Sequence, residues 1–137
     1  MSFTIQIFNT SALKAVPRAK ITQTVERVLK GEKISEAEIN IIIVSDEEIH
    51  EMNRNFLQHD YPTDVITFPL GDDPLEGEIY ISADTAAAQS REYKASLTNE
   101  LMRLAAHGAL HLAGYNDATD AERHTMHLLE NRYICSE

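Results

Sequence analysis

The sequence contains little cysteine, no tryptophan and no long hydrophobic run. Its 137 residues include one cysteine, Cys135, which excludes an internal disulfide. No apolar stretch approaches the roughly 18 residues that a membrane-spanning helix needs. The first ten residues, MSFTIQIFNT, lack the basic and apolar regions of a secretory signal. We therefore expect a cytoplasmic protein that does not have a membrane as a partner.

Interdomain linkers, internal repeats and low-complexity tracts are also missing from the sequence. A chain of 137 residues fits one domain and is long enough to bury a core without disulfides. The hydrophobic fraction of 43% and the charged fraction of 25% are ordinary for a globular protein. We therefore expect a single domain over residues 1–137.

Positive charge is scarce as well. Twelve lysines and arginines stand against 22 aspartates and glutamates, for a formal net charge of −10, so the surface as a whole disfavours nucleic acid. Residues 14–33 are the exception, because six basic and two acidic residues give this segment a charge of +4. Such a segment is either a solvated surface or a face that contacts phosphates. Its candidate phosphate ligands are Arg18, Arg27 and Lys30.

The apolar pattern predicts four strands and five helices. Residues 3–8 (FTIQIF) alternate as a half-buried strand does, and further strands are predicted at 38–45, 64–68 and 78–82. The continuous apolar centre of residues 38–45 indicates burial on both faces. One helix is predicted at 17–30, and a second begins at residue 45. Three more follow: one ends at about residue 94, one runs through the histidine region, and the last ends at about residue 133. Their expected caps are Ser45 with Glu48, Ser82 or Asp84, Ser96 or Thr98, and Thr119 with Glu122. This order predicts an α+β fold in which about five helices cover a small mixed four-stranded sheet.

The segment HGALHLAGYND, residues 107–117, carries a candidate metal site at the end of a helix. His107 and His111 are four residues apart, which places them on one helix face. Gly114 can end the helix, because glycine readily adopts the left-handed conformation, and the chain can then bring Asp117 back to the histidines. The pattern H-x-x-x-H-x-x-G-x-x-D supplies three ligands and leaves open positions, as hydrolytic metal sites require. A histidine pair alone is often incidental, and His124 is the reserve third ligand.

Gly108 argues against a metalloprotease of the H-E-x-x-H type. In that motif a glutamate directly follows the first histidine and acts as the general base. The residue after His107 is glycine, which provides no base. Glycine at this position instead indicates close approach by another backbone or by substrate.

Taken together, these motifs resemble the YbeY family, metal-dependent endoribonucleases that mature ribosomal RNA in bacteria. HGALHLAGY (107–115) resembles the family's H-G-x-L-H-L-x-G-Y block, and PTDVITFP (62–69) its P-T-D-V-L-S-F-P segment, with Asp64 on the matching aspartate. GEIYIS (77–82) resembles its G-D-I-x-I-S strand, and NELMRLAAHG (99–108) its approach to the first histidine. The resemblance spans most of the chain in the same order.

Two positions depart from the family pattern. Asn116 and Asp117 stand where the family has aspartate and its third histidine, so the resemblance implies Asp117 as the third ligand. A carboxylate in place of an imidazole lowers the formal charge at a divalent ion from +2 to +1. This predicts a less acidic water at the ion and more tolerance of metals such as manganese. Leu57 stands where the family typically has an arginine important for activity, and Arg54, one helical turn earlier, is the candidate replacement.

The resemblance implies an endoribonuclease that acts in ribosomal RNA maturation, namely small-subunit 3′ end processing and ribosome quality control. One Zn²⁺ per chain is the expected cofactor, with Mn²⁺ or Ni²⁺ as alternatives, bound by His107, His111 and Asp117. The implied partners are ribosomal RNA and the small ribosomal subunit, and ribosomal proteins or a GTPase are further candidates. Arg18, Arg27 and Lys30 would contact the RNA. The general base is unknown, and Glu100, seven residues before His107, is a candidate base, an outer support of the metal site or a solvent-facing residue.

Two other functions stay open. The protein can be a non-catalytic ribosome-assembly factor whose metal is structural, which the acidic surface and Leu57 favour. It can also be a metal-dependent hydrolase of a small molecule.

Overall fold

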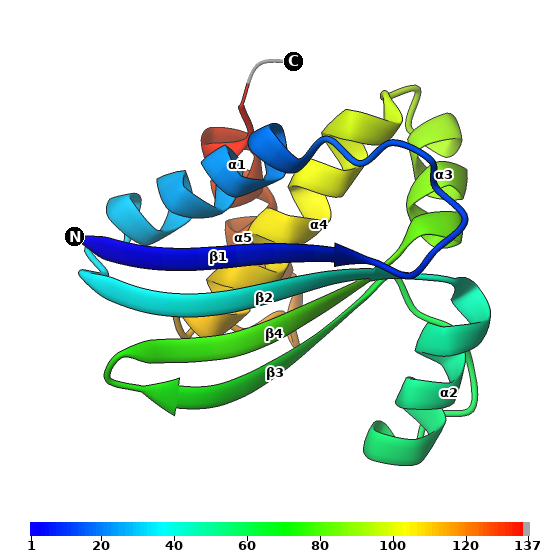
Figure 1. Cartoon of the computed structure of the whole chain (residues 1–137), viewed down its shortest axis with the longest axis horizontal. Coiled ribbons are helices and arrows are strands. Elements are labelled where there is room, and N and C mark those ends of the chain that lie inside the picture. The colour runs from blue at the N-terminus through cyan, green and yellow to red at the C-terminus, as the bar shows by residue number, and fades with distance from the viewer. Residues whose placement is uncertain (136–137) are drawn as a thin grey trace.

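The computed structural model describes residues 1–135 and forms one α+β domain (Figure 1). In chain order its elements are β1 (Ser2–Asn9), α1 (Arg18–Gly31), β2 (Glu36–Val44), α2 (Asp46–Leu57), β3 (Val65–Asp72), β4 (Leu75–Ser82), α3 (Ala83–Glu92), α4 (Leu97–Leu112) and α5 (Asp120–Tyr133). The predicted fold class is therefore confirmed.

The four strands form one mixed sheet in the order β1-β2-β4-β3. β1 and β4 both pair with β2 in parallel, whereas β3 pairs with β4 in antiparallel fashion. The stretch GDDPLEG (71–77), between the third and fourth predicted strands, has the glycine and proline of a turn-rich connection, yet most of it is strand. Asp72 pairs with Leu75, and only Asp73 and Pro74 form the turn. Pro69 is tolerated within β3 because β3 is an edge strand with a register shift at this point.

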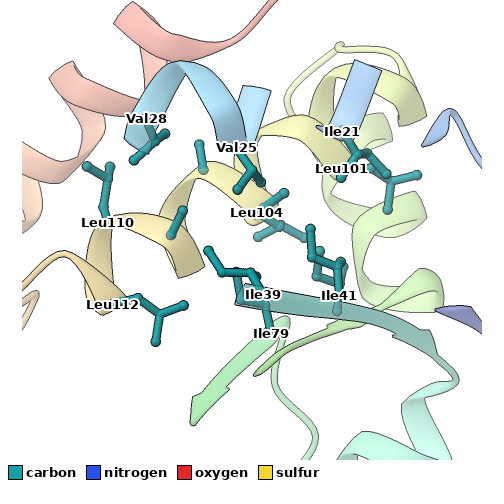
Figure 2. Packing of buried hydrophobic residues seen from close by; sticks show 14 of the residues in the cluster. Ile21, Val25, Val28, Ile39, Ile41, Ile79, Leu101, Leu104, Leu110 and Leu112 are labelled. Carbon is teal, nitrogen blue, oxygen red and sulfur yellow. The ribbon is translucent and has the colours of Figure 1, made fainter. Parts of the chain in front are cut away.

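The main core lies between one face of the sheet and helices α1 and α4 (Figures 1 and 2). Ile39 and Ile41 of β2 and Ile79 of β4 are completely buried beneath these helices. The helix residues that cover them include Ile21, Val25, Val28, Leu101, Leu104 and Leu110. Burying an aliphatic side chain of this size contributes about 1.5–3 kcal/mol, so this layer fixes α4 firmly against the sheet.

The opposite face of the sheet is covered only at one end. α2 packs there through a smaller cluster that contains Val44, Ile49 and Ile66. Ile42 is half-buried, although the neighbouring Ile41 and Ile43 of β2 are completely buried. The predicted burial of β2 on both faces is therefore wrong for the second face, because one short helix covers only part of it.

Most helix starts follow the predicted caps. Ser45 with Glu48 and Thr119 with Glu122 form reciprocal capping boxes at α2 and α5. Where the sequence allowed two choices, the hydroxyls of Ser82 and Ser96 accept the backbone N–H three residues ahead. Within residues 1–135, no helix combines the length and apolar character required to cross a membrane.

Candidate metal centre

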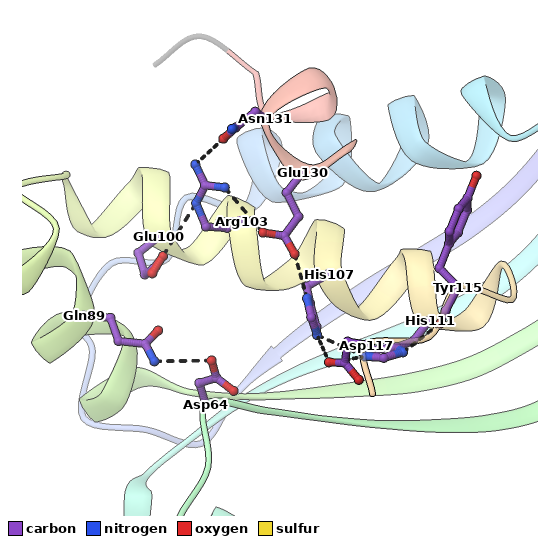
Figure 3. Close-up of polar contacts among 10 residues, drawn as sticks. All are labelled: Asp64, Gln89, Glu100, Arg103, His107, His111, Tyr115, Asp117, Glu130 and Asn131. Carbon is purple, nitrogen blue, oxygen red and sulfur yellow. Dashed lines mark hydrogen bonds and ion pairs between the residues drawn. The ribbon is translucent and has the colours of Figure 1, made fainter. Parts of the chain in front are cut away.

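α4 brings the two histidines of the predicted site to the rim of the core. Most of this helix is buried, but His107 and His111 keep side-chain exposures of 20% and 26%. α4 ends at Leu112, and Gly114 follows with a φ of +110°, a conformation that side chains disfavour. The chain then turns back, as predicted, and carries Asp117 to the two rings (Figure 3).

The three candidate ligand atoms form a small triangle. The Nε2 atoms of His107 and His111 are 3.0 Å apart. Oδ2 of Asp117 lies 3.2 Å from the first and 3.3 Å from the second. Zinc ligands at about 2.0–2.2 Å in tetrahedral geometry are separated by about 3.3 Å from one another. Among residues 1–135, His107, His111 and Asp117 are the group of histidine, cysteine and carboxylate side chains whose spacing suits a metal ion.

Acceptors behind both rings fix which nitrogens face the triangle. His107 Nδ1 lies 2.6 Å from Oε2 of Glu130, and His111 Nδ1 lies 3.0 Å from the carbonyl oxygen of Tyr115. A carboxylate and a carbonyl accept hydrogen bonds, so each Nδ1 carries the proton. Each Nε2 therefore faces the other ring and the carboxylate of Asp117. Two imidazole nitrogens and one carboxylate oxygen are a donor set that fits a divalent metal.

Glu130 also sets the electrostatics of His107. Burial lowers the pKa of His107, but the hydrogen bond and charge of Glu130, together with the charges of Asp117 and Asp64, outweigh burial. The net result is a pKa above the ordinary histidine value. Because these groups stabilise positive charge at the imidazole, they also favour a cation bound to its other nitrogen.

Glu130 belongs to a polar network that the sequence did not reveal. Arg103 donates to Oδ1 of Asn131 at 2.7 Å and lies 3.4 Å from Oε1 of Glu130 and 3.9 Å from Oε1 of Glu100 (Figure 3). One signal could have identified Glu130: it lies between Met126 and Tyr133 on the buried stripe of α5. A carboxylate on an apolar stripe needs a partner.

Glu100 does not face solvent, which removes one of the predicted alternatives. Only 2% of the residue is exposed. Burial raises the pKa of Glu100, and the charges of Asp64 and Glu130 add to this effect, whereas the charge of Arg103 opposes it. Glu100 is thus a buried partner of Arg103, which lies one turn later on α4 and also contacts Glu130, the residue that supports His107.

Two clefts meet at the candidate ligands. The first, which we call the α5 cleft, has a volume of about 690 Å³, and its polar lining includes Gln89, Glu100, Arg103, Arg123 and Glu130. The second, the β3 cleft, has a volume of about 410 Å³, and its lining includes Leu57, Thr63, Thr67, Pro69 and Tyr115. Only Asp64, His107 and Asp117 line both. The triangle is therefore accessible from two sides.

Asp64 is the one shared residue that is not in the triangle. It immediately precedes β3, and its Oδ2 accepts a hydrogen bond from Gln89 at 3.3 Å (Figure 3). The sequence placed Asp64 on a family motif without a role. Asp64 is therefore a carboxylate that lines both clefts beside the candidate ligands.

Other predicted residues lie apart from the triangle. His124, the reserve ligand, is exposed on α5 and lines neither cleft. Arg54 is exposed on α2 and lines neither cleft, whereas Leu57 lines the β3 cleft. The α5 cleft holds two arginines, Arg103 and Arg123, so guanidinium groups do lie near the centre, although not at the predicted position.

Gly108 serves packing against the sheet. A Cβ at this position would lie 2.6 Å from Cγ2 of Ile79. The close approach predicted at Gly108 therefore involves an isoleucine side chain of β4, and not another backbone or substrate.

The three basic residues predicted to contact RNA all lie on α1, outside both clefts. Arg18 donates to the carbonyl oxygen of Ile7, and Arg27 donates to those of Tyr133 and Arg132 at 2.9 and 3.1 Å. Arg27 and Lys30 line a separate cavity of about 440 Å³. The structure thus separates the basic helix from the candidate metal centre.

Comparisons with known proteins agree with the motifs. Residues 6–136 match the family model described as "Endoribonuclease YbeY". An "Endoribonuclease YbeY" of Chloroherpeton thalassium is 40% identical over 95% of this chain and 93% of the relative, and one of Chlorobium phaeovibrioides is 39% identical over 96% and 88%. The solution structure of TM1509 from Thermotoga maritima superimposes with a TM-score of 0.70 and 32% identity, over 96% of this chain and 87% of that one. The chain therefore belongs to the YbeY endoribonuclease family.

Proposed function

We propose that this member of the YbeY family is a metal-dependent endoribonuclease that acts on ribosomal RNA in the cytoplasm. Its specific task in this proposal is 3′ end processing of small-subunit RNA, with a role in ribosome quality control. The cofactor is one Zn²⁺ per chain, held by Nε2 of His107, Nε2 of His111 and Oδ2 of Asp117.

One observation carries the proposal: three converging ligands lie where two clefts meet. Structural zinc sites are closed by four protein ligands, whereas catalytic sites use three and keep a position for water or substrate. Here the described residues supply three ligand atoms, and both clefts lead to them. This arrangement supports a catalytic metal over a structural one.

The protein groups around the site have distinct tasks in the proposed reaction. A divalent metal lowers the pKa of water and polarises a phosphoryl oxygen. Glu130 and the Tyr115 carbonyl hold the two imidazoles in the binding tautomer. Asp64 orients the attacking water from its place between the clefts, and Gln89 holds its carboxylate. The guanidinium groups of the α5 cleft lie on the side where the phosphate's negative charge can be stabilised.

Asp64→Ala tests the role of that carboxylate. The turnover number should fall by about 10²–10⁴-fold, the range for a positioned group that handles a water proton. Metal content should stay at the wild-type level because Asp64 is not in the triangle. Loss of metal together with activity would show instead that Asp64 is needed for the ligands themselves.

The carboxylate of Asp117 predicts the metal preference. Two imidazoles and one carboxylate leave a formal +1 at a divalent ion, which favours oxygen-preferring metals more than three imidazoles would. Asp117→His should therefore narrow the preference toward zinc and shift the pH–rate profile to lower pH. Unchanged metal preference and an unchanged profile would contradict this assignment.

The RNA in this proposal extends beyond the clefts and reaches α1, where Arg18, Arg27 and Lys30 contact flanking phosphates. The proposed partners are the small ribosomal subunit with its RNA, and ribosomal proteins or a GTPase.

Two measurements on the same samples test the proposed function. The metal content of the wild type and of Asp117→Ala is determined by elemental analysis, and both proteins are then assayed for RNA cleavage. We expect the wild type to contain one metal per chain and to cleave precursor ribosomal RNA. Asp117→Ala should fold, but should lose the metal and the cleavage. If loss of metal mainly lowers the melting temperature and the wild type never cleaves RNA, the metal is structural and the protein is an assembly factor. Turnover of a small ester or phosphate without RNA cleavage would favour the small-molecule hydrolase.

A further inference from the structure

A single carboxylate at the end of α1 holds both segments that support the candidate metal ligands. Glu32 directly follows α1. Its Oε1 accepts a hydrogen bond from the hydroxyl of Tyr115 at 2.7 Å, and its Oε2 accepts one from the hydroxyl of Tyr133 at 2.6 Å. One glutamate thus joins the loop after α4 and the end of α5, which are separated in sequence by the whole length of α5.

Each tyrosine belongs to a segment that supports one histidine. The carbonyl oxygen of Tyr115 accepts a hydrogen bond from Nδ1–H of His111, so the hydroxyl contact with Glu32 fixes the residue that orients that ring. Tyr133 lies one turn after Glu130, whose carboxylate lies 2.6 Å from Nδ1 of His107. Figure 3 shows Tyr115 extending from the ligand loop away from the triangle and toward α1.

These contacts are well suited to holding geometry. Hydrogen bonds to a carboxylate are stronger than those between neutral groups. Burial together with the hydrogen bond and charge of Glu32 raises the pKa of Tyr133 to about 12, so this hydroxyl stays protonated and donates at neutral pH. Tyr133 also lies under Gly31, where an added Cβ would come 2.3 Å from its hydroxyl oxygen, so its ring has little freedom.

We propose that Glu32 is a positioning residue of the metal centre, which sets the orientation of both imidazoles through Tyr115 and Tyr133. This inference rests on the proposed metal site, and it adds a residue that touches neither the metal ligands nor the clefts. Outer partners of metal-bound histidines are worth 10–100-fold in metal affinity, and a residue that acts through them should lie at the lower end.

The test compares Glu32→Ala with Glu32→Gln and with Glu78→Ala in the full chain. Glu78 is a matched control because its Oε1 also accepts a tyrosine hydroxyl, that of Tyr80 at 3.2 Å, away from the metal centre. Metal affinity is measured by competition with a chelator, and ligand geometry by the visible absorption spectrum of the Co²⁺-loaded protein.

Glu32→Ala should weaken Co²⁺ and Zn²⁺ binding by about tenfold and change the Co²⁺ spectrum. Glu32→Gln should keep part of the metal affinity and of the wild-type Co²⁺ spectrum, because its amide oxygen still accepts a hydrogen bond from one tyrosine hydroxyl. Glu78→Ala should change neither. Wild-type affinity and spectrum in Glu32→Ala would overturn the inference, whereas failure of the wild type to bind metal would overturn the proposed metal centre itself.

If Glu32→Ala does not fold, the variants Tyr115→Phe and Tyr133→Phe test whether Glu32 acts through the two tyrosine hydroxyls. Phenylalanine removes each hydroxyl but keeps the packing of the ring. Each should weaken metal binding, and the double variant should reproduce the Co²⁺ spectrum of Glu32→Ala. Adding Glu32→Gln to the double variant should then cause no further loss, since residues that act as one unit are not additive. A full additional loss, or phenylalanine variants with wild-type binding, would exclude action through the tyrosines.

Discussion

Helices α4 and α5 each carry a pair of histidines on one side, yet the two pairs have opposite surroundings. His107 and His111 of α4 are half-buried, and each Nδ1 has an acceptor behind it. His124 and His127 of α5 are exposed, and within residues 1–135 neither has a hydrogen bond or an ion pair. Both pairs have a spacing that puts them on one helix face. The difference lies in what packs against the helix.

Helical spacing supplies only two of the ligands that a metal site requires. The rings must also be fixed in one tautomer, which Glu130 and the Tyr115 carbonyl do for α4. A third ligand must come from outside the helix, which Asp117 provides. Among residues 1–135, the pair on α5 has neither a tautomer-fixing acceptor nor a third ligand.

Removing one histidine from each pair should give the largest contrast. His111→Ala removes one of three ligands and should abolish stoichiometric metal binding. Since a catalytic metal supplies several kcal/mol, RNA cleavage should fall by about 10³-fold or more. His124→Ala should leave metal content and cleavage unchanged. Elemental analysis and single-turnover cleavage measure both, and a comparable loss in His124→Ala would refute the distinction between the pairs.

Glu130→Gln removes the charge behind His107 while keeping the shape of the side chain. The amide supports the ring less and can favour the wrong tautomer, so metal affinity should fall by about 10–100-fold. Chelator competition measures the change. Glu122→Gln, on the same helix but in its N-terminal cap, is the matched control and should keep the wild-type affinity.

Gly108→Ala tests how tightly α4 is held against the sheet. The new Cβ would meet Ile79 at 2.6 Å, and overpacking of this kind costs about 1–3 kcal/mol. Alanine gains about 1 kcal/mol in helix propensity, so we expect a net loss of about 1 kcal/mol in the free energy of unfolding. Urea denaturation measures it. A variant more stable than the wild type would mean that α4 can move away from β4 at no cost.

The smallest effect is expected for the charges of α1, which lie away from both histidine pairs. Arg27→Gln combined with Lys30→Gln should reduce the salt dependence of RNA binding, with the slope falling by about one for each lost phosphate contact. Cleavage of an oligonucleotide too short to reach α1 should not change. An unchanged slope on long RNA would remove α1 from the proposed interface.

Local patterns in the sequence predicted the fold well. The capping boxes at Ser45 and Thr119 are contained within four residues each, and both are present. Errors arose where the outcome depended on distant packing. The glycines and proline of segment 71–77 indicate a turn, but β3 and β4 remain paired as far as Asp72 and Leu75. The second face of β2 reads as buried, but α2 covers only its end.

The sequence alone determined that His107 and His111 share a face and that Gly114 allows the chain to turn back, because helical spacing and glycine's positive φ are local properties. The tertiary structure decided the rest of the candidate site. Glu130 contacts His107 although the two are 23 residues apart in sequence, and Glu32 contacts Tyr115 although these two are 83 residues apart. No local rule relates such positions, since they come together only when α1, α4 and α5 bury their apolar faces in one core.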